Sequence, residues 1–200
     1  FDKALEIDPK YVHALNCKGT TLDDLGKYDE AIVWFDKALE IASKHIPSLC
    51  NKGLTLMTLG KYDEARDFYN KVLEIDQNNV YALSAKGQII STQQGKDDEA
   101  IVYFDKALEI DPKYLNALNN KAWALVKMER YEEALLFSEK GLVAVSNTPN
   151  NIHTMGYILL KLKQYQDAIK WFDKALAIDP NHKDIIKDRQ LAADAAKLDK

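Results

Sequence analysis

The string FDKALEIDPKY occupies residues 1–11 and recurs without a single change at residues 104–114. A shorter copy, FDKALEI, stands at residues 35–41, and a copy of full length with three changes, FDKALAIDPNH, stands at residues 172–182. Such self-similarity over distances of many residues indicates that the chain is built from internal repeats, so the period of the repeat is the first quantity to establish.

A second string fixes that period. LGKYDEA stands at residues 25–31 and again at residues 59–65, and weaker forms of it follow three times. Every copy closes on an alanine, and these alanines are Ala31, Ala65, Ala100, Ala134 and Ala168. From each alanine to the next, the residue number increases by 34, except for one step of 35 between Ala65 and Ala100. A constant period of this length is typical of architectures in which each unit buries its apolar side against its neighbours.

Each unit reads as two helices. In the first full unit Leu15, Gly19 and Leu22 recur at i, i+4 and i+7, which is one face of a helix. Gly26 then interrupts the pattern, and a second amphipathic stripe runs over residues 28–41. Small residues recur at one place on the first helices, where two helices would approach closely: Gly19, Gly53, Gly87, Ala122 and Gly156. Asp-Pro pairs end second helices, because the residue before proline is pushed out of the helical region.

This pattern resembles the tetratricopeptide repeat, and in particular arrays common in archaeal and bacterial proteins. The resemblance rests on the 34-residue period, the pair of small residues, the tyrosine after the glycine turn and the closing proline. It covers practically the whole chain. It implies an all-α fold, a right-handed α-solenoid (superhelix) of antiparallel helix pairs, whose first helices line a concave groove.

The period also predicts the domain organisation. Residues 1–11 would be the second half of a truncated repeat, and residues 183–200 a C-terminal capping helix with a polar outer face. Between them we expect five complete repeats, at residues 12–45, 46–79, 80–114 (with a one-residue insertion), 115–148 and 149–182. The fourth repeat has Ser138 and Gly141 where the others have larger residues, so we expect the softest junction at residues 141–151.

Charge and hydropathy exclude several classes of function. The chain has 27 Lys and Arg against 31 Asp and Glu, so its formal net charge is −4, and no basic surface for nucleic acid is expected. A lysine recurs on each second helix, but an acid or amide precedes it each time, which predicts a solvated outer face. No apolar run reaches the length of a membrane span. We therefore expect a cytoplasmic protein, and, because the chain opens on Phe1, one that is part of something longer.

Signals for catalysis, metals and cofactors are absent from the sequence. The four histidines show neither HExxH spacing nor cysteine or carboxylate partners at ligand spacing. Cys17 and Cys50 are expected to be free thiols. Paired carboxylates such as Asp29-Glu30 open second helices, where negative charge suits the helix dipole. These patterns predict a non-enzyme with no metal and no cofactor.

The first helices are the expected binding surface. Trp123 and Tyr157 fall at equivalent places one repeat apart, and Asn119 and Asn120 lie nearby. Rings at such places bury apolar area of a peptide, while amides pair with its backbone. The alternative is that the two rings pack against the neighbouring helix or the cap. The full set of predicted peptide-binding residues is Asn16, Thr20, Asn51, Leu54, Met57, Tyr81, Gln88, Asn119, Asn120, Trp123, Lys127, Tyr157 and Leu160.

We therefore predict a non-catalytic protein–protein interaction scaffold that holds a peptide or partner segment in the concave groove. One alternative is a self-associating scaffold that stacks end to end into a homo-oligomer through its exposed terminal half-repeat. Another is the regulatory arm of a larger protein. Capture of a chaperone's C-terminal carboxylate, which some members of the family perform, is disfavoured, since only its single-asparagine element is matched, by Asn51 or Asn120.

Overall fold

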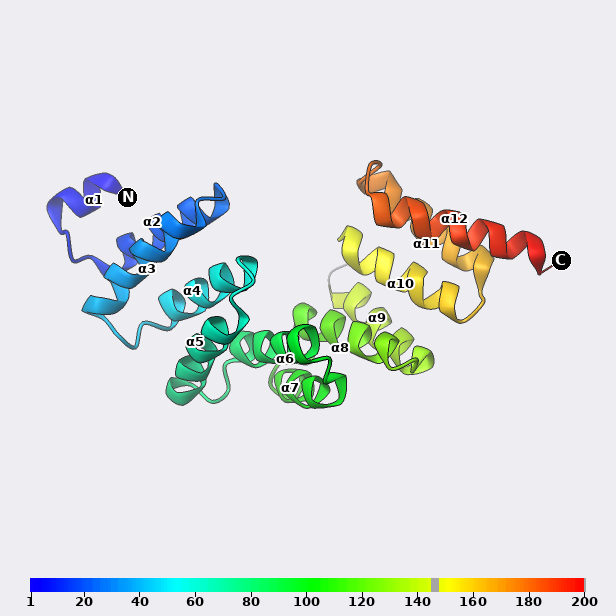
Figure 1. The fold of residues 1–200 in the computed structure, drawn as a ribbon, viewed down its shortest axis with the longest axis horizontal. Helices are drawn as coiled ribbons and strands as arrows, with labels where there is room; N and C mark the ends of the chain where they lie inside the picture. Colours follow the sequence, from blue (N-terminus) through cyan, green and yellow to red (C-terminus); the bar gives the residue numbers. More distant parts are fainter. Residues whose placement is uncertain (145–147, 200) are drawn as a thin grey trace. The chain divides into compact units, whose positions relative to one another are not determined.

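The computed structural model describes residues 1–144 and 148–199, and in these residues it contains twelve helices and no strands (Figure 1). The first helices of the predicted repeats are α2 (Val12–Asp24), α4 (Ile46–Thr58), α6 (Val80–Gln94), α8 (Leu115–Lys127) and α10 (Pro149–Lys161). The second helices are α3 (Tyr28–Ile41), α5 (Tyr62–Ile75), α7 (Asp97–Ile110), α9 (Tyr131–Ala144) and α11 (Tyr165–Ile178). A short α1 (Asp2–Ile7) precedes them, and α12 (Lys183–Leu198) follows.

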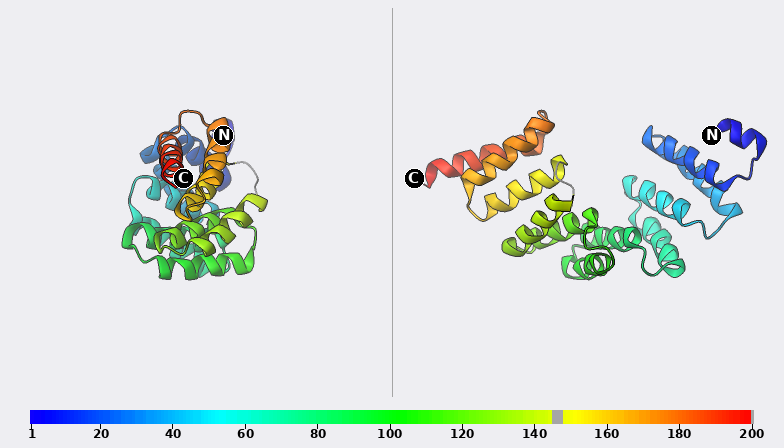
Figure 2. Two further views of the ribbon diagram at one scale, coloured as in Figure 1. Left: turned by 90° about the vertical axis from the view of Figure 1, so that its right-hand side faces the viewer. Right: turned by 180° about the vertical axis from the view of Figure 1, so that it is seen from behind.

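The helices form two compact units, residues 1–94 and residues 95–200. In the first unit each helix from α2 to α6 packs on the next one along the chain, and α4 also contacts α2 and α6. In the second unit the same holds from α7 to α12, and α10 also contacts α8 and α12 (Figures 1 and 2). Successive antiparallel helix pairs therefore stack on one another, and the expected all-α, α-solenoid class is confirmed.

The turns inside the helix pairs need a residue in the left-handed region. Gly26, Gly60 and Gly95 have φ of 74°, 74° and 62°. After α2 the turn closes with hydrogen bonds from the N–H of Gly26 to the carbonyl of Asp23 (2.8 Å) and from the N–H of Lys27 to that of Leu22 (2.9 Å). The fourth and fifth repeats form this turn without glycine, with Glu129 and Lys163 at φ of 59° and 61°.

The contact between the two helices of a pair depends on a glycine facing a buried ring. A Cβ added to Gly19 would lie 2.5 Å from Phe35, one at Gly53 2.8 Å from Tyr69, and one at Gly156 2.7 Å from Phe172. Such distances are shorter than real non-bonded carbon–carbon contacts, so the three rings occupy the space that a methyl group would need. These rings are fully buried, and they form the centre of the core together with the alanines of the repeat.

In the fourth repeat the residue on the first helix is larger and the facing residue on the second helix is smaller than in the other repeats. Ala122 stands where the other first helices have glycine, and Ser138 stands where the other second helices have an aromatic ring. Both residues are buried, at 0% and 2% exposure. The expected soft junction at residues 141–151 includes residues 145–147, which lie outside the described residues, so that expectation stays a prediction, as does the division into repeats.

Candidate functional site

In the first unit a polar network joins the first helices α2 and α4. Asn16 Oδ1 accepts hydrogen bonds from Ser48 Oγ (3.0 Å) and from Asn51 Nδ2 (3.2 Å). The amide of Asn51 also donates to Thr20 Oγ1 (3.1 Å). His45 Nδ1 lies 2.8 Å from Ser48 Oγ, and it is the donor there, because the single hydroxyl proton of Ser48 goes to Asn16. Three of the predicted peptide-binding residues thus bond to each other and fasten two helices together.

This network follows a register that the sequence analysis missed. Asn16 and Ser48 are 32 residues apart, and so are Asp23 and Thr55, whose hydroxyl donates to the carboxylate at 2.5 Å. In the second unit Asn119 donates to Asn151 over the same separation. A separation of 35 residues joins Asn16 to Asn51 and His153 to Asp188. The sequence signal for these bonds is a pair of polar residues 32 or 35 positions apart, on two successive first helices or on α10 and α12.

The other predicted residues of the first unit divide between core and surface. Met57 and Tyr81 are half-buried and pack against the core cluster around Leu49 and Leu56, and the rings of Tyr81 and Tyr69 lie 6.0 Å apart. Leu54 is 43% exposed, and Gln88 is also exposed. These last two are the most exposed of the predicted residues in the first unit.

In the second unit an aromatic pair links α8 and α10. The ring centroids of Trp123 and Tyr157 are 5.3 Å apart with an angle of 39° between the planes, which is a favourable tilted arrangement. His153 lies beside both, at 6.4 Å from Trp123 and 6.5 Å from Tyr157. Both rings are half-buried and pack against the cluster around Leu125 and Ile158. Part of each ring is therefore packed against the core, and the rest of its surface is exposed to solvent.

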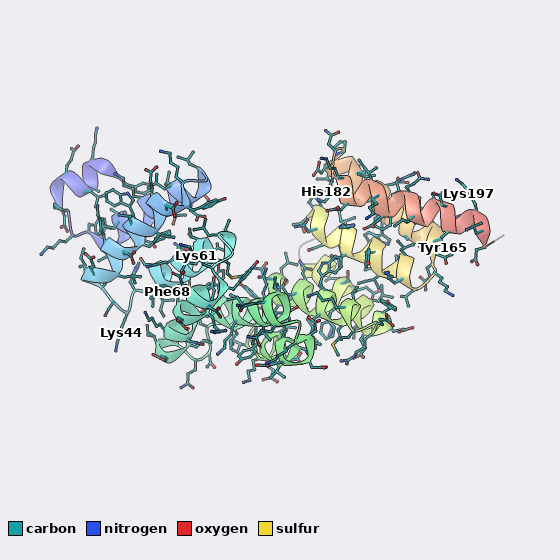
Figure 3. The ribbon with its side chains drawn as sticks, viewed as in Figure 1. Lys44, Lys61, Phe68, Tyr165, His182 and Lys197 are labelled. Atoms are coloured by element: carbon teal, nitrogen blue, oxygen red, sulfur yellow. The ribbon has the colours of Figure 1, made fainter. Side chains whose placement is uncertain are left out.

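His153 also fixes the last helix. Its Nε2 lies 2.9 Å from Asp188 Oδ2 on α12, and its ring lies 5.8 Å from Phe172 and 6.0 Å from His182. The Nδ1 atom of His182, at the start of α12 (Figure 3), is buried without a hydrogen-bond partner in the described part of the chain. Asp188 takes the place that Asn51 has in the first unit, so α12 is joined to α10 as α4 is to α2.

The remaining predicted residues of the second unit, and the neighbouring Lys161, have separate contacts. Lys161 Nζ lies 5.2 Å from the ring centroid of Tyr157, and Lys127 Nζ lies 3.5 Å from a carboxylate oxygen of Asp97. Asn119 bonds to Asn151 between the helices, whereas Asn120 and Leu160 are half-buried. The structure thus brings Trp123 and Tyr157 together, whereas the amide of Asn119 is used in a hydrogen bond to Asn151 of α10.

Two titratable groups of the first unit have pKa values that burial shifts. Burial raises the pKa of the Cys50 thiol to about 11, so this thiol stays protonated near neutrality. Burial and the neighbouring His13 lower the pKa of His45. Within residues 1–144 and 148–199 no group of three or more His, Cys, Asp or Glu side chains is arranged to hold a metal ion. In the same residues, none of the helices combines the length and apolar character of a membrane span.

Family models match most of the chain. Two tetratricopeptide repeat models match residues 11–78 and 50–115. A model of the anaphase-promoting complex, cyclosome, subunit 3, matches residues 93–175 and 127–196. Together the matches extend over residues 11–196. A search among proteins of curated function found no match.

Solved structures with the same fold share about a fifth of the sequence. A tetratricopeptide repeat protein from Parabacteroides merdae superposes with a TM-score of 0.76 at 22% identity, over 96% of this chain and 75% of the other. YrrB, described as a tetratricopeptide repeat protein with an unusual peptide-binding site, gives 0.63 at 21% identity, over 98% and 97%. The Cut9–Hcn1 hetero-tetramer of the anaphase-promoting complex gives 0.88 at 21% identity, over 96% of this chain and 38% of that one.

Proposed function

The chain belongs to the tetratricopeptide repeat family, and we propose that it is a scaffold that binds a partner peptide over the Trp123–Tyr157 pair. The fold is that of protein–protein interaction scaffolds, which are typically non-catalytic. Two proteins of similar fold are named for such roles, YrrB for a peptide-binding site and Cut9–Hcn1 as a hetero-tetramer. The Trp123–Tyr157 pair is the proposed place at which a peptide binds on this chain.

The observation that supports the proposal is the half-buried aromatic pair itself. Trp123 and Tyr157 stand at the ninth place of their first helices, with centroids 5.3 Å apart. Rigid rings offer a large contact area at a small cost in side-chain entropy. The same place in the first unit carries Thr20, Leu54 and Gln88, so the aromatic surface is specific to the second unit.

The surroundings of the pair favour a peptide of a particular composition. Leu160 stands three residues after Tyr157 on α10, where both side chains pack against the same core cluster, and the ammonium of Lys161 lies over Tyr157. An apolar side chain of the peptide would rest on the rings, and an acidic side chain next to it would meet Lys161. Covering the exposed part of each ring contributes about 1–2 kcal/mol, a good share of the ~8 kcal/mol behind a micromolar complex.

The test is selection of binding peptides on the full chain. A displayed library of random dodecapeptides is enriched on the wild-type protein, and the binders are measured by titration against two variants. Trp123→Ala is expected to weaken them at least about tenfold, as loss of a central aromatic anchor does. Trp34→Ala is the matched control, because it removes a half-buried tryptophan from the second helix α3 and should leave the affinity unchanged.

Equal affinity of the selected peptides for wild type and Trp123→Ala would refute the proposed site. Circular dichroism of both variants establishes that the fold is retained. End-to-end self-association is a separate prediction, which light scattering over a range of concentrations addresses directly. A mass that rises with concentration would support it.

A further inference from the structure

A basic residue recurs at the seventh place of the first helices and pairs with the second helix that precedes it. Lys52 Nζ lies 2.5 Å from Asp36 Oδ1, and Lys86 Nζ lies 2.8 Å from Asn70 Oδ1. Lys121 pairs with Asp105 in the same way, and Arg189 of α12 with Asp173 at 2.5 Å. The sequence separation of the two partners is the same in every case, so these bonds are a property of the repeat.

Lysines at this seventh place also lie over an aromatic ring of the second helix that follows. Lys18 Nζ is 4.1 Å from the ring centroid of Trp34, Lys52 is 4.6 Å from that of Phe68, and Lys121 is 3.9 Å from that of Phe137. A second lysine, one helical turn after each ring, lies at 4.0, 4.7 and 5.0 Å: Lys37, Lys71 and Lys140. Phe68 projects from α5 in Figure 3. Each ring is thus contacted by two ammonium groups, a favourable cation–π arrangement.

The fifth repeat lacks the first of these two lysines. Its seventh residue is Met155, which is 3% exposed. Trp171 is the corresponding ring of α11, and among the described residues Lys174 is the only cation that contacts it, at 4.1 Å. Glu139 of α9 stands at the place of Asp36 and Asp105, and it has no hydrogen bond or ion pair with any described residue. In other repeats one lysine contacts both this ring and this carboxylate. In the fifth repeat the ring and the carboxylate are present, but the lysine is absent.

A pocket lies at this place. It has a volume of about 580 Å³, and Glu139, Met155 and Trp171 line it together with Leu135, Leu142 and Leu159. Asp167 also lines the pocket, and its carboxylate already pairs with Lys170 Nζ at 2.8 Å. At the corresponding junction of the first unit, the pocket lined by Asp36, Phe68 and Lys71 has about 420 Å³. The larger pocket therefore combines an apolar wall, an aromatic ring and the carboxylate of Glu139, which suits a cation on an aliphatic stem.

We propose that this Glu139–Trp171 pocket binds a lysine side chain of a partner protein. The incoming ammonium pairs with Glu139 and lies over Trp171, and its four-carbon stem rests on the leucines. The chain itself shows this geometry twice, where Lys52 pairs with Asp36 and lies over Phe68 and where Lys121 pairs with Asp105 and lies over Phe137. Charge complementarity and this internal template identify the occupant as lysine. Neither Trp123 nor Tyr157 lines the pocket, so the inference does not depend on the peptide platform.

The test uses the indole N–H signals of the full chain in NMR titrations with Nα-acetyl-lysine amide. The chain has three tryptophans, and a Trp171→Phe variant assigns the signal of Trp171. That signal should shift and saturate at millimolar concentrations. Nα-acetyl-norleucine amide, which has the stem without the charge, should bind at least about fivefold more weakly. Trp34 is the internal control, because two lysines already contact it and its signal should not respond.

Two variants of the pocket complete the experiment. Met155→Lys introduces the intrachain lysine of the other repeats and should abolish the response of Trp171, whereas Met155→Leu should retain it. Glu139→Gln, at an exposed position, should weaken binding of the lysine probe and leave norleucine unaffected. The proposal is overturned if Trp171 responds no more than Trp34, if norleucine binds as well as lysine, or if Nα-acetyl-arginine amide binds as tightly as lysine. An unchanged response in a folded Met155→Lys or Glu139→Gln variant overturns it as well.

Discussion

Replacement of Gly156 by alanine tests the close contact between α10 and α11. The new Cβ would lie 2.7 Å from Phe172 Cε1, 2.8 Å from Cδ1 and 3.2 Å from Cζ. Because Phe172 is fully buried, its ring cannot turn away without displacing the core around it. The substitution therefore forces either the ring off its rotamer or the two helices apart.

The expected magnitude is the difference of two effects. Overpacking of a filled core costs about 1–3 kcal/mol, whereas alanine in a helix is about 1 kcal/mol better than glycine. The net result is a loss of about 1 kcal/mol, in an outer range of ~0 to 2 kcal/mol. For a unit of roughly one hundred residues this lowers the melting temperature by ~4–8 °C.

The assay is urea unfolding followed by circular dichroism and tryptophan fluorescence. Because the units of a repeat array do not have to unfold together, hydrogen exchange of the α10 and α11 amides locates the effect. The decisive comparison uses a Phe172→Val background, which removes all three atoms that the new methyl would meet. There the same Gly156→Ala substitution should stabilise by about 1 kcal/mol, because only the helix propensity remains.

A change of the same sign in both backgrounds would refute the steric explanation. Ala122→Gly is the matched control, since the fourth repeat has alanine at this place opposite Ser138. That variant should be destabilised by about 1 kcal/mol, because glycine has a lower helix propensity than alanine and no aromatic ring at residue 138 needs the space of the methyl group.

Three further outcomes are expected. Asn16→Ala should cost about 1–3 kcal/mol in urea unfolding, because Ser48 and Asn51 lose a common acceptor, and a double-mutant cycle with Asn51→Ala should give a coupling energy. Because the pKa of His45 is lowered in the folded chain, the unfolded chain binds a proton on this imidazole at higher pH than the folded chain does. Stability should therefore fall as the pH decreases below 6.5. A His45→Gln variant should show a flatter pH profile of the melting temperature. A Cys17→Ser variant leaves Cys50 as the only cysteine of the chain. Because its pKa is about 11, alkylation at pH ~8 should be about tenfold slower than that of a free cysteine peptide. The fraction of thiolate is far smaller, and the greater nucleophilicity of that thiolate compensates only in part.

The period was sufficient to predict the helix pairs and the close glycine contacts, because both repeat with the sequence. The proximity of Trp123 and Tyr157 was predictable in the same way, because they stand at equivalent places one repeat apart. The orientation of Asn16 was not predictable from spacing alone. Neighbouring places on a helix differ by about 100° around its axis, so a modest rotation decides whether an amide faces a ligand or the next helix. Asp188 was missed because α12 does not carry the repeat motif.

Some substitutions that break the repeat pattern are accompanied by a second substitution at the facing position, and others are not. Ala122 adds a methyl group where the other first helices have glycine, and Ser138 removes a ring from the facing place, so that pair of changes conserves the packing of the core. Met155 removes a lysine, yet both of its usual contacts remain, as Glu139 and Trp171. A compensated change maintains the fold and needs no partner. An uncompensated one leaves a charge and a ring without their usual contact, and a side chain from another molecule can restore both.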